Sequence, residues 1–325
     1  MMLALGLAAL LWGLWVNTQR ADARWRFELY AFDFAAGTLL GALLLAFTAG
    51  SAGSADTFTF LDLMTVAGKR NMATAAGGGV LFGIGNLIVL AGVTLGGMST
   101  ALPAGAAMAL LVGIAWQAIG GKTGNSGLVF GGAAVAIAAL VAGALAQRAV
   151  AAATPVKKGL HPGWKGFILA VVGGLMAGAG LPLLESSRGG DLGVGAYGAV
   201  VFGALGIFLI TPLVDLYLLN LPVKGEPLSP LAYLKGTMKQ HLLGIAGGVL
   251  WSTGAVAMLA AASGTFADAA KPLGAQAGAQ ASALIGAVCG VLLWKEKAES
   301  GSGRGLSLAA GALVAGAAAM VYLGA

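Results

Sequence analysis

Hydrophobic residues fall into ten long runs along the chain, separated by short polar segments. Each run has roughly 18 to 25 residues, enough for a helix to cross a hydrocarbon layer about 30 Å thick. A soluble fold would need ten fully buried helices in one small domain, which surface-to-volume scaling does not allow. The pattern therefore predicts an all-α polytopic membrane protein with ten transmembrane helices. These lie near residues 2–18, 29–49, 73–95, 98–117, 127–147, 165–184, 193–218, 240–262, 272–294 and 305–323.

Composition supports the membrane assignment. Of 325 residues, 58% are hydrophobic and only 9% are charged, against about 25% charged in soluble domains. The net charge of +6 resides in the loops, where membrane topology accounts for it, so no nucleic-acid partner is expected. The first run lacks a preceding basic residue and a small-residue cleavage site before Asn17, and we count it as a span. A single cysteine, Cys289, excludes a disulfide within the chain.

A stretch of the first half recurs 169 residues later. Residues 78–106 and 247–275 are identical at 11 of 29 positions, and the aromatic Phe82 corresponds to the aromatic Trp251. Internal duplication in an apolar chain is typical of transporters built from two structural repeats. We predict a first five-helix repeat over 1–149, a cytoplasmic linker over 150–164 and a second five-helix repeat over 165–325. An odd number of spans per repeat makes the repeats inverted.

Glycine and proline indicate where helices touch or bend. Gly37 with Gly41, and Gly174 with Gly178, are small residues four apart, which allow close helix packing in lipid. Proline at the first turn of a helix loses no hydrogen bond, and we expect this of two prolines in corresponding positions of the repeats. Two further prolines lie deeper and predict bends, either static kinks or hinges. The first pair is Pro103 and Pro272, and the second is Pro182 and Pro212.

Two ionisable side chains within the spans are candidates for coupling to an ion gradient. A charge at mid-bilayer costs about 2.5–3.5 kcal/mol on insertion scales, so its retention suggests use. Asp33 in the second span is a candidate substrate contact or proton carrier, or an interfacial residue paired with Arg24 or Arg26. His241 opens the eighth span and can titrate near neutral pH, or it can serve as a cap at the headgroup level.

Two more carboxylates lie close to helix ends. Glu185 ends the sixth span, and Arg188 lies about one turn further on, so a salt bridge between them is expected. Asp215 lies near the end of the seventh span, and its partner is not evident from the sequence.

Uncharged polar and aromatic side chains predict a solute site. Amides, hydroxyls and indoles near the bilayer midplane suit a small polar solute, because apolar rings shape a pocket and a few polar groups orient the ligand. The alternative is that they are hydrogen bonds holding helices together. On the corresponding helices of the two repeats, we expect Asn86 and Trp251 to line one cavity. The candidate substrate-binding residues are Trp12, Asn17, Asn86, Trp251, Thr253, Gln276 and Gln280.

Several chemistries are not indicated by the sequence. Two histidines and one cysteine, far apart, offer no metal-ligand spacing. The GGKTG stretch at 120–124 lacks the first glycine of a nucleotide-binding loop, because Trp116 occupies that position. We therefore expect no cofactor and no enzymatic activity. A membrane-embedded enzyme, or a scaffold that transports nothing, stays the alternative of another class.

The chain also resembles a known superfamily. WGLWVNTQ, RFELYAFDFAAG, GGGVLFGIGN and LLWKEK in the first, second, third and ninth spans are similar to the drug/metabolite transporters. In the second half, LGVGAYGAVVFGALGIFLITP and HLLGIAGGVLW are similar to the same group, in particular to bacterial relatives of the ureide permease and glucose/rhamnose uptake branches. The resemblance implies two inverted five-helix repeats with the fifth and tenth helices peripheral and a cavity between the others.

The function expected from these features is secondary active transport. The solute would be a small polar metabolite such as a sugar, a nucleobase or a ureide, moved by alternating access in the bacterial cytoplasmic membrane. A proton or sodium ion is the expected co-ion. A drug or amino-acid exporter of the same superfamily is the alternative, and whether the protein forms a homodimer stays open.

The first prediction concerns orientation in the membrane. Thirteen of the 18 Lys and Arg residues lie in the odd-numbered loops, including the linker with Lys157 and Lys158. Because basic loops stay in the cytoplasm, both termini should lie outside. A reporter that matures only in the cytoplasm should stay silent at the C-terminus and become active when inserted in the linker. An active C-terminal fusion would contradict the orientation.

Overall fold

The computed structural model describes residues 2–52, 58–121, 124–156, 158–262 and 272–325. All regular structure in these residues is helical, and ten of the helical segments are long and apolar enough to cross a membrane. The prediction of ten apolar spans is therefore confirmed in number and in approximate position. The ninth predicted span is divided into α10, α11 and a π-helical turn, η2.

The helices corresponding to the predicted spans begin and end as follows. They are α1 (Met2–Arg20), α2 (Phe27–Phe47), α4 (Lys69–Gly96), α5 (Met98–Ile119), α6 (Ser126–Ala153), α7 (Pro162–Arg188), α8 (Gly195–Asn220), α9 (Met238–Ala261), α10 (Pro272–Gln280), α11 (Ser282–Val288), η2 (Cys289–Leu293) and α12 (Gly301–Gly324).

Two short helices were not predicted. The α3 helix (Phe60–Val66) starts with a capping box, in which Thr59 and Asp62 each accept a hydrogen bond from the other residue's backbone N–H. The bonds from Thr59 also hold the pKa of Asp62 below its ordinary value. The 3₁₀ helix η1 (Pro230–Lys235) starts with Ser229, whose hydroxyl accepts from the N–H of Leu231. Both starts follow the preference of Ser and Thr for the N-cap position, and the second also follows that of Pro for the first turn.

The prolines behave as predicted with one exception. Pro272 is the first residue of α10, and Pro182 and Pro212 lie inside α7 and α8. Pro103 is not in the first turn of its helix. Because α5 already begins at Met98, Pro103 lies in its second turn, where it removes the hydrogen bond that its N–H would have given to the preceding turn.

The chain divides into two compact units. The first comprises Met1–Ile84, Ala179–Pro222 and Glu226–Pro272, and the second comprises Gly85–Gly178, Val223–Gly225 and Leu273–Ala325. Thus α1, α2, α3, α8 and α9 belong to the first unit, and α5, α6, α11 and α12 belong to the second. The helices α4 and α7 contribute residues to both. The predicted repeats are a property of the sequence, and each compact unit includes helices from both of them.

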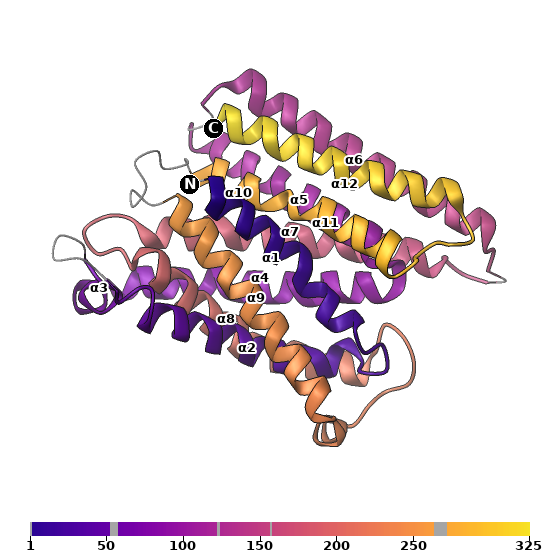
Figure 1. Ribbon diagram of the computed structural model, residues 1–325, viewed down its shortest axis with the longest axis horizontal. Coiled ribbons are helices and arrows are strands. Elements are labelled where there is room, and N and C mark those ends of the chain that lie inside the picture. Colours follow the sequence, from indigo (N-terminus) through magenta and orange to yellow (C-terminus); the bar gives the residue numbers. More distant parts are fainter. Residues whose placement is uncertain (1, 53–57, 122–123, 157, 263–271) are drawn as a thin grey trace. The chain divides into compact units, whose positions relative to one another are not determined.

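In the first unit, α9 packs on both α1 and α2, and α2 also packs on α8 (Figure 1). The contact between α2 and α9 is made by glycines. A Cβ atom added at Gly37 would overlap the backbone carbonyl of Ile245, and one added at Gly248 would overlap the backbone of Phe34. The Gly37 and Gly41 pair therefore has the close-packing role that its spacing predicts.

In the second unit, α6 and α12 lie side by side, and both pack on α5 (Figure 1). Alanine and branched aliphatic side chains fill the core between them, including Leu110, Val129, Val314 and Val321. The predicted Gly174 and Gly178 pair again makes close contacts. A Cβ atom at Gly174 would overlap the backbone of Gly105 on α5.

The glycine contact between α2 and α9 leads to a stability prediction. Gly248→Ala forces the two backbones apart and should destabilise the protein by about 1–3 kcal/mol, as overpacking does. Gly316→Ala on α12 is the matched control, because nothing lies within 4 Å of a Cβ atom there, and it should unfold no earlier than the wild type. Thermal unfolding in detergent measures both. Equal unfolding temperatures for the two variants would contradict the close packing.

Candidate functional site

The two coupling candidates meet in the first unit. Asp33 on α2 is 2% exposed, and Nδ1 of His241 on α9 lies 3.0 Å from each of its carboxyl oxygens. The hydroxyl of Tyr233 on η1 donates to Oδ1 of Asp33 at 2.5 Å. A carboxylate from one half of the chain is thus held by an imidazole and a phenol from the other half. We refer to Asp33, Tyr233 and His241 as the acid cluster.

Local structure explains why these side chains converge. A capping box between Thr237 and Gln240 starts α9, which places His241 in the first turn of the helix. Gly244 lies one turn further along, and a Cβ atom there would overlap the side chain of Asp33. Gly236 leaves similar room for the imidazole ring. Glycine on both sides of His241 therefore lets the carboxylate and the ring approach.

Aromatic rings enclose the acid cluster. The ring centroids of Tyr233 and His241 are 4.7 Å apart. Trp25 packs edge-on against His241, with 5.4 Å between the ring centroids. Phe32 packs edge-on against Tyr233 at 5.6 Å. Burial and the hydrogen bond to Asp33 raise the pKa of the Tyr233 phenol above its ordinary value. Tyr233 therefore stays a hydrogen-bond donor to the carboxylate at neutral pH.

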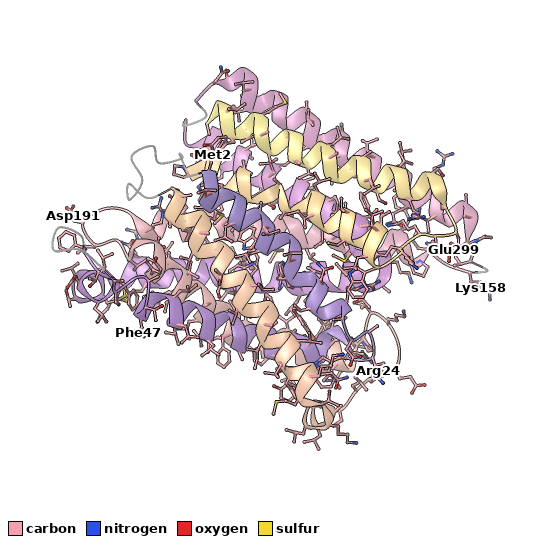
Figure 2. All side chains as sticks on the ribbon, in the orientation of Figure 1. Met2, Arg24, Phe47, Lys158, Asp191 and Glu299 are labelled. Carbon is pink, nitrogen blue, oxygen red and sulfur yellow. The ribbon has the colours of Figure 1, made fainter. Side chains whose placement is uncertain are left out.

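Asp33 does not pair with either arginine suggested as an alternative. Arg24 bonds Asp22, with Nε 3.3 Å from Oδ1, and this contact is the main reason that the pKa of Asp22 lies below its ordinary value. Arg26 bonds Glu28, with Nη2 2.6 Å from Oε1. Both arginines lie in the short α1–α2 loop, where a carboxylate two residues away is within reach. Figure 2 shows Arg24 at the end of the first unit where this loop lies.

Three aromatic rings form a second group in the first unit. Phe82 and Trp251, which occupy corresponding positions of the predicted repeats, have ring centroids 4.6 Å apart. Trp12 stacks on Trp251 at 6.0 Å, and its indole N–H donates to the backbone carbonyl of Trp251. All three side chains are buried. This aromatic group brings together two of the predicted substrate-binding residues.

The remaining predicted substrate-binding residues are divided between the two units, with Asn17 and Thr253 in the first. Asn17 donates to the carbonyls of Gly13 and Leu14 in its own helix, and the hydroxyl of Thr253 donates to Val249 in its own helix. These bonds stabilise the helices themselves.

The other amides belong to the second unit. Asn86, Gln276 and Gln280 are buried there, and Nε2 of Gln276 has no hydrogen-bond partner among the residues that the structure describes. Because Asn86 and Trp251 belong to different units, their shared cavity stays a prediction. Glu185 and Arg188 form the salt bridge expected from their spacing, and Arg188 also donates to the carbonyl of Ala262.

A polar clamp after η2 was not predicted. The carboxylate of Glu296 accepts from the backbone N–H groups of Met98 and Ser99 at 3.0 and 2.8 Å, and so caps the start of α5. Nζ of Lys297 donates to the hydroxyls of Ser99 and Thr100 at 2.8 and 3.0 Å. The LLWKEK sequence marks the end of a span, but no local pattern indicates which helix start it would cap.

Tyr233 was also missed. The Ser-Pro pair before it is a recognisable helix start, yet nothing in the sequence relates that helix to Asp33, 200 residues earlier.

No protein-family model and no curated protein matches this chain. The interpretation of the site therefore depends on its own geometry.

The clamp leads to a prediction about pH. Burial lowers the pKa of Lys297 from 10.5 to about 8. Between these two values the unfolded chain binds a proton that the folded protein does not, so stability should rise with pH across this window, by up to about 1.4 kcal/mol per pH unit. Lys297→Gln should flatten this rise, whereas Lys69→Gln at the exposed start of α4 should not. Unfolding temperatures measured from pH 7.5 to 10.5 test this, and equal slopes for all three proteins would contradict it.

Proposed function

We propose that this protein is a secondary active transporter, and that the acid cluster carries the coupling proton. The observation that carries the proposal is the contact between Asp33 and His241 inside an apolar ten-helix chain. Asp33 lies about 9 Å along the axis from the start of α2 at 1.5 Å per residue. A carboxylate kept at that depth is costly, which favours a functional role.

The chemistry of the cluster suits reversible proton binding. A carboxylate and an imidazole in hydrogen-bond contact can share one proton, and the position of that proton depends on whether the two side chains stay together. The contact exists because α2 and α9 touch at Gly244. A movement that draws α9 away from α2 at Gly244 would separate acid from base. Proton binding would in this way be coupled to helix movement, as alternating access requires.

The aromatic group supports a small polar solute, such as a sugar, a nucleobase or a ureide. Flat rings such as those of Trp12, Phe82 and Trp251 can stack on the faces of such molecules, while a few amides orient them. The duplication supports two inverted five-helix repeats, between which such solutes bind in other transporters. Membership of the drug/metabolite transporter superfamily is part of the same proposal.

The choice of solute is tested by a stabilisation screen. Purified protein is heated with sugars, nucleobases, ureides and amino acids in turn, and a true solute raises the unfolding temperature. At one hundred times its Kd, binding adds about 2.7 kcal/mol to the free energy of unfolding. Replacing Trp251 by Ala should reduce that shift. A response only to amino acids or to hydrophobic drugs would instead support the exporter.

The coupling role is tested by Asp33→Asn, which keeps the size of the side chain and removes its titration. The variant should exchange solute across proteoliposomes at a rate near that of the wild type, yet lose accumulation driven by a pH gradient. Arg24→Gln is the matched control, because Arg24 bonds Asp22 and not Asp33, and it should accumulate solute normally. Accumulation by Asp33→Asn equal to that of the wild type would make Asp33 a structural residue.

A further inference from the structure

Asp215 is an acidic residue buried within α8, in the first unit. Its exposed fraction is 0%, and neither carboxyl oxygen has a hydrogen-bond partner in the part of the chain that the structure describes. Buried polar groups are almost always bonded, so a carboxyl group with two unbonded oxygens requires an explanation. Asp33 in the same unit shows how a buried carboxyl group is usually accommodated, because Tyr233 and His241 both bond it.

No cationic side chain among the described residues bonds Asp215. The carboxylate that acts on it is Glu28 on α2, which is itself 1% exposed. Glu28 accepts two bonds from Arg26, at 2.6 and 3.2 Å, and a third N–H of Arg26 donates to the carbonyl of Glu226 at 2.6 Å. The guanidinium is thus bonded to Glu28 and Glu226, and no bond from it to Asp215 is found among the described residues.

The charged groups on the other helices that pack on α8 are exposed or are bonded to other residues. On α9, His241 is bonded to Asp33 and Lys239 is exposed. On α3, Asp62 is bonded to Thr59. On α4, Lys69 and Arg70 lie in the exposed first turn. On α7, which meets α8 where Leu184 lies against Gly203, Arg188 is bonded to Glu185. Asp215 is the one ionisable acid or base within α8 apart from its tyrosines.

A proton is the cation that these surroundings can accommodate. An ionised carboxylate without water, donors or a partner charge is strongly disfavoured, and such groups become neutral instead. A metal ion would need several further oxygen ligands, and the described residues contain no group of three acidic, histidine or cysteine side chains that could hold one. The protonated carboxylic acid needs neither a partner charge nor metal ligands.

We propose that Asp215 is a second proton-binding site, separate from the acid cluster, occupied while α2 and α8 pack as they do here. Release requires water at the carboxyl group, so that the proton passes from the acid oxygen to water and leaves the carboxylate behind. Pro212, one turn earlier, cannot donate a backbone hydrogen bond within α8. The helix therefore has a natural point at which its last turns can move away from α2.

Proton binding at Asp215 does not depend on transport, whereas its use in coupling depends on the proposed function. The two can therefore fail separately. If Asp33→Asn leaves accumulation unchanged but Asp215 holds a proton, the site stands and the acid cluster is structural. If Asp215 holds no proton, the site is wrong whatever the transport assay shows.

The test is infrared spectroscopy of the purified full-length protein at pH 7, which distinguishes a carboxylic acid from a carboxylate by its carbonyl band. Asp215→Asn should lose one carboxyl equivalent from the acid band, and Asp215→Leu should do the same if the amide variant does not fold. The exposed Asp191, labelled in Figure 2, provides the control, and Asp191→Asn should leave the acid band unchanged. An acid band in both Asp215 variants equal to that of the wild type would overturn the proposal.

A sodium titration tests whether Asp215 binds a sodium ion instead of a proton. The unfolding temperature of the wild type should not depend on replacing sodium by an organic cation of equal concentration. A sodium-dependent rise that Asp215→Asn abolishes would assign Asp215 to a metal site and overturn proton binding there.

Discussion

The close backbone contact between α2 and α9 brings Asp33 and His241 together. Lipid does not drive apolar helices together, so helices in a membrane associate through close packing and polar contacts. Gly37 on α2 and Gly248 on α9 let the two backbones touch. This separation is also what allows the imidazole of His241 to reach Asp33. A larger residue at Gly244 would occupy the space of the Asp33 side chain.

Buried ionisable groups are accommodated in different ways. Glu28 is neutralised by a neighbouring arginine, and Asp33 is held by two donors from distant parts of the chain. Lys297 donates to backbone and hydroxyl oxygens, and burial of its amino group lowers its pKa. Neither carboxyl oxygen of Asp215 has a hydrogen-bond partner in the described part of the chain. Because a full charge is least tolerable where no partner exists, Asp215 is the group most expected to be neutral.

If the proposed transport function holds, the positions of these groups suit the coupling of proton binding to helix movement. Asp33 and Asp215 are presented by α2 and α8, which pack on each other, and Asp33 faces α9. Movement of α8 or α9 relative to α2 would therefore change the surroundings of a carboxyl group at either contact. A protein can couple proton binding to conformation in this way without any metal or cofactor, because the affinity for a proton follows the local solvation.

The sequence by itself determined the ten spans, the two glycine pairs and the Glu185–Arg188 salt bridge. These depend on length, hydropathy and spacing within one helix, which are local properties. Only the tertiary structure decided that Asp33 bonds His241 and Tyr233 rather than Arg24 or Arg26, and that Glu296 caps α5. Those partners are about 200 residues apart, and which one wins depends on how closely two helices approach. The separation of two helices depends on packing over their whole contact faces, and a local sequence pattern does not predict it.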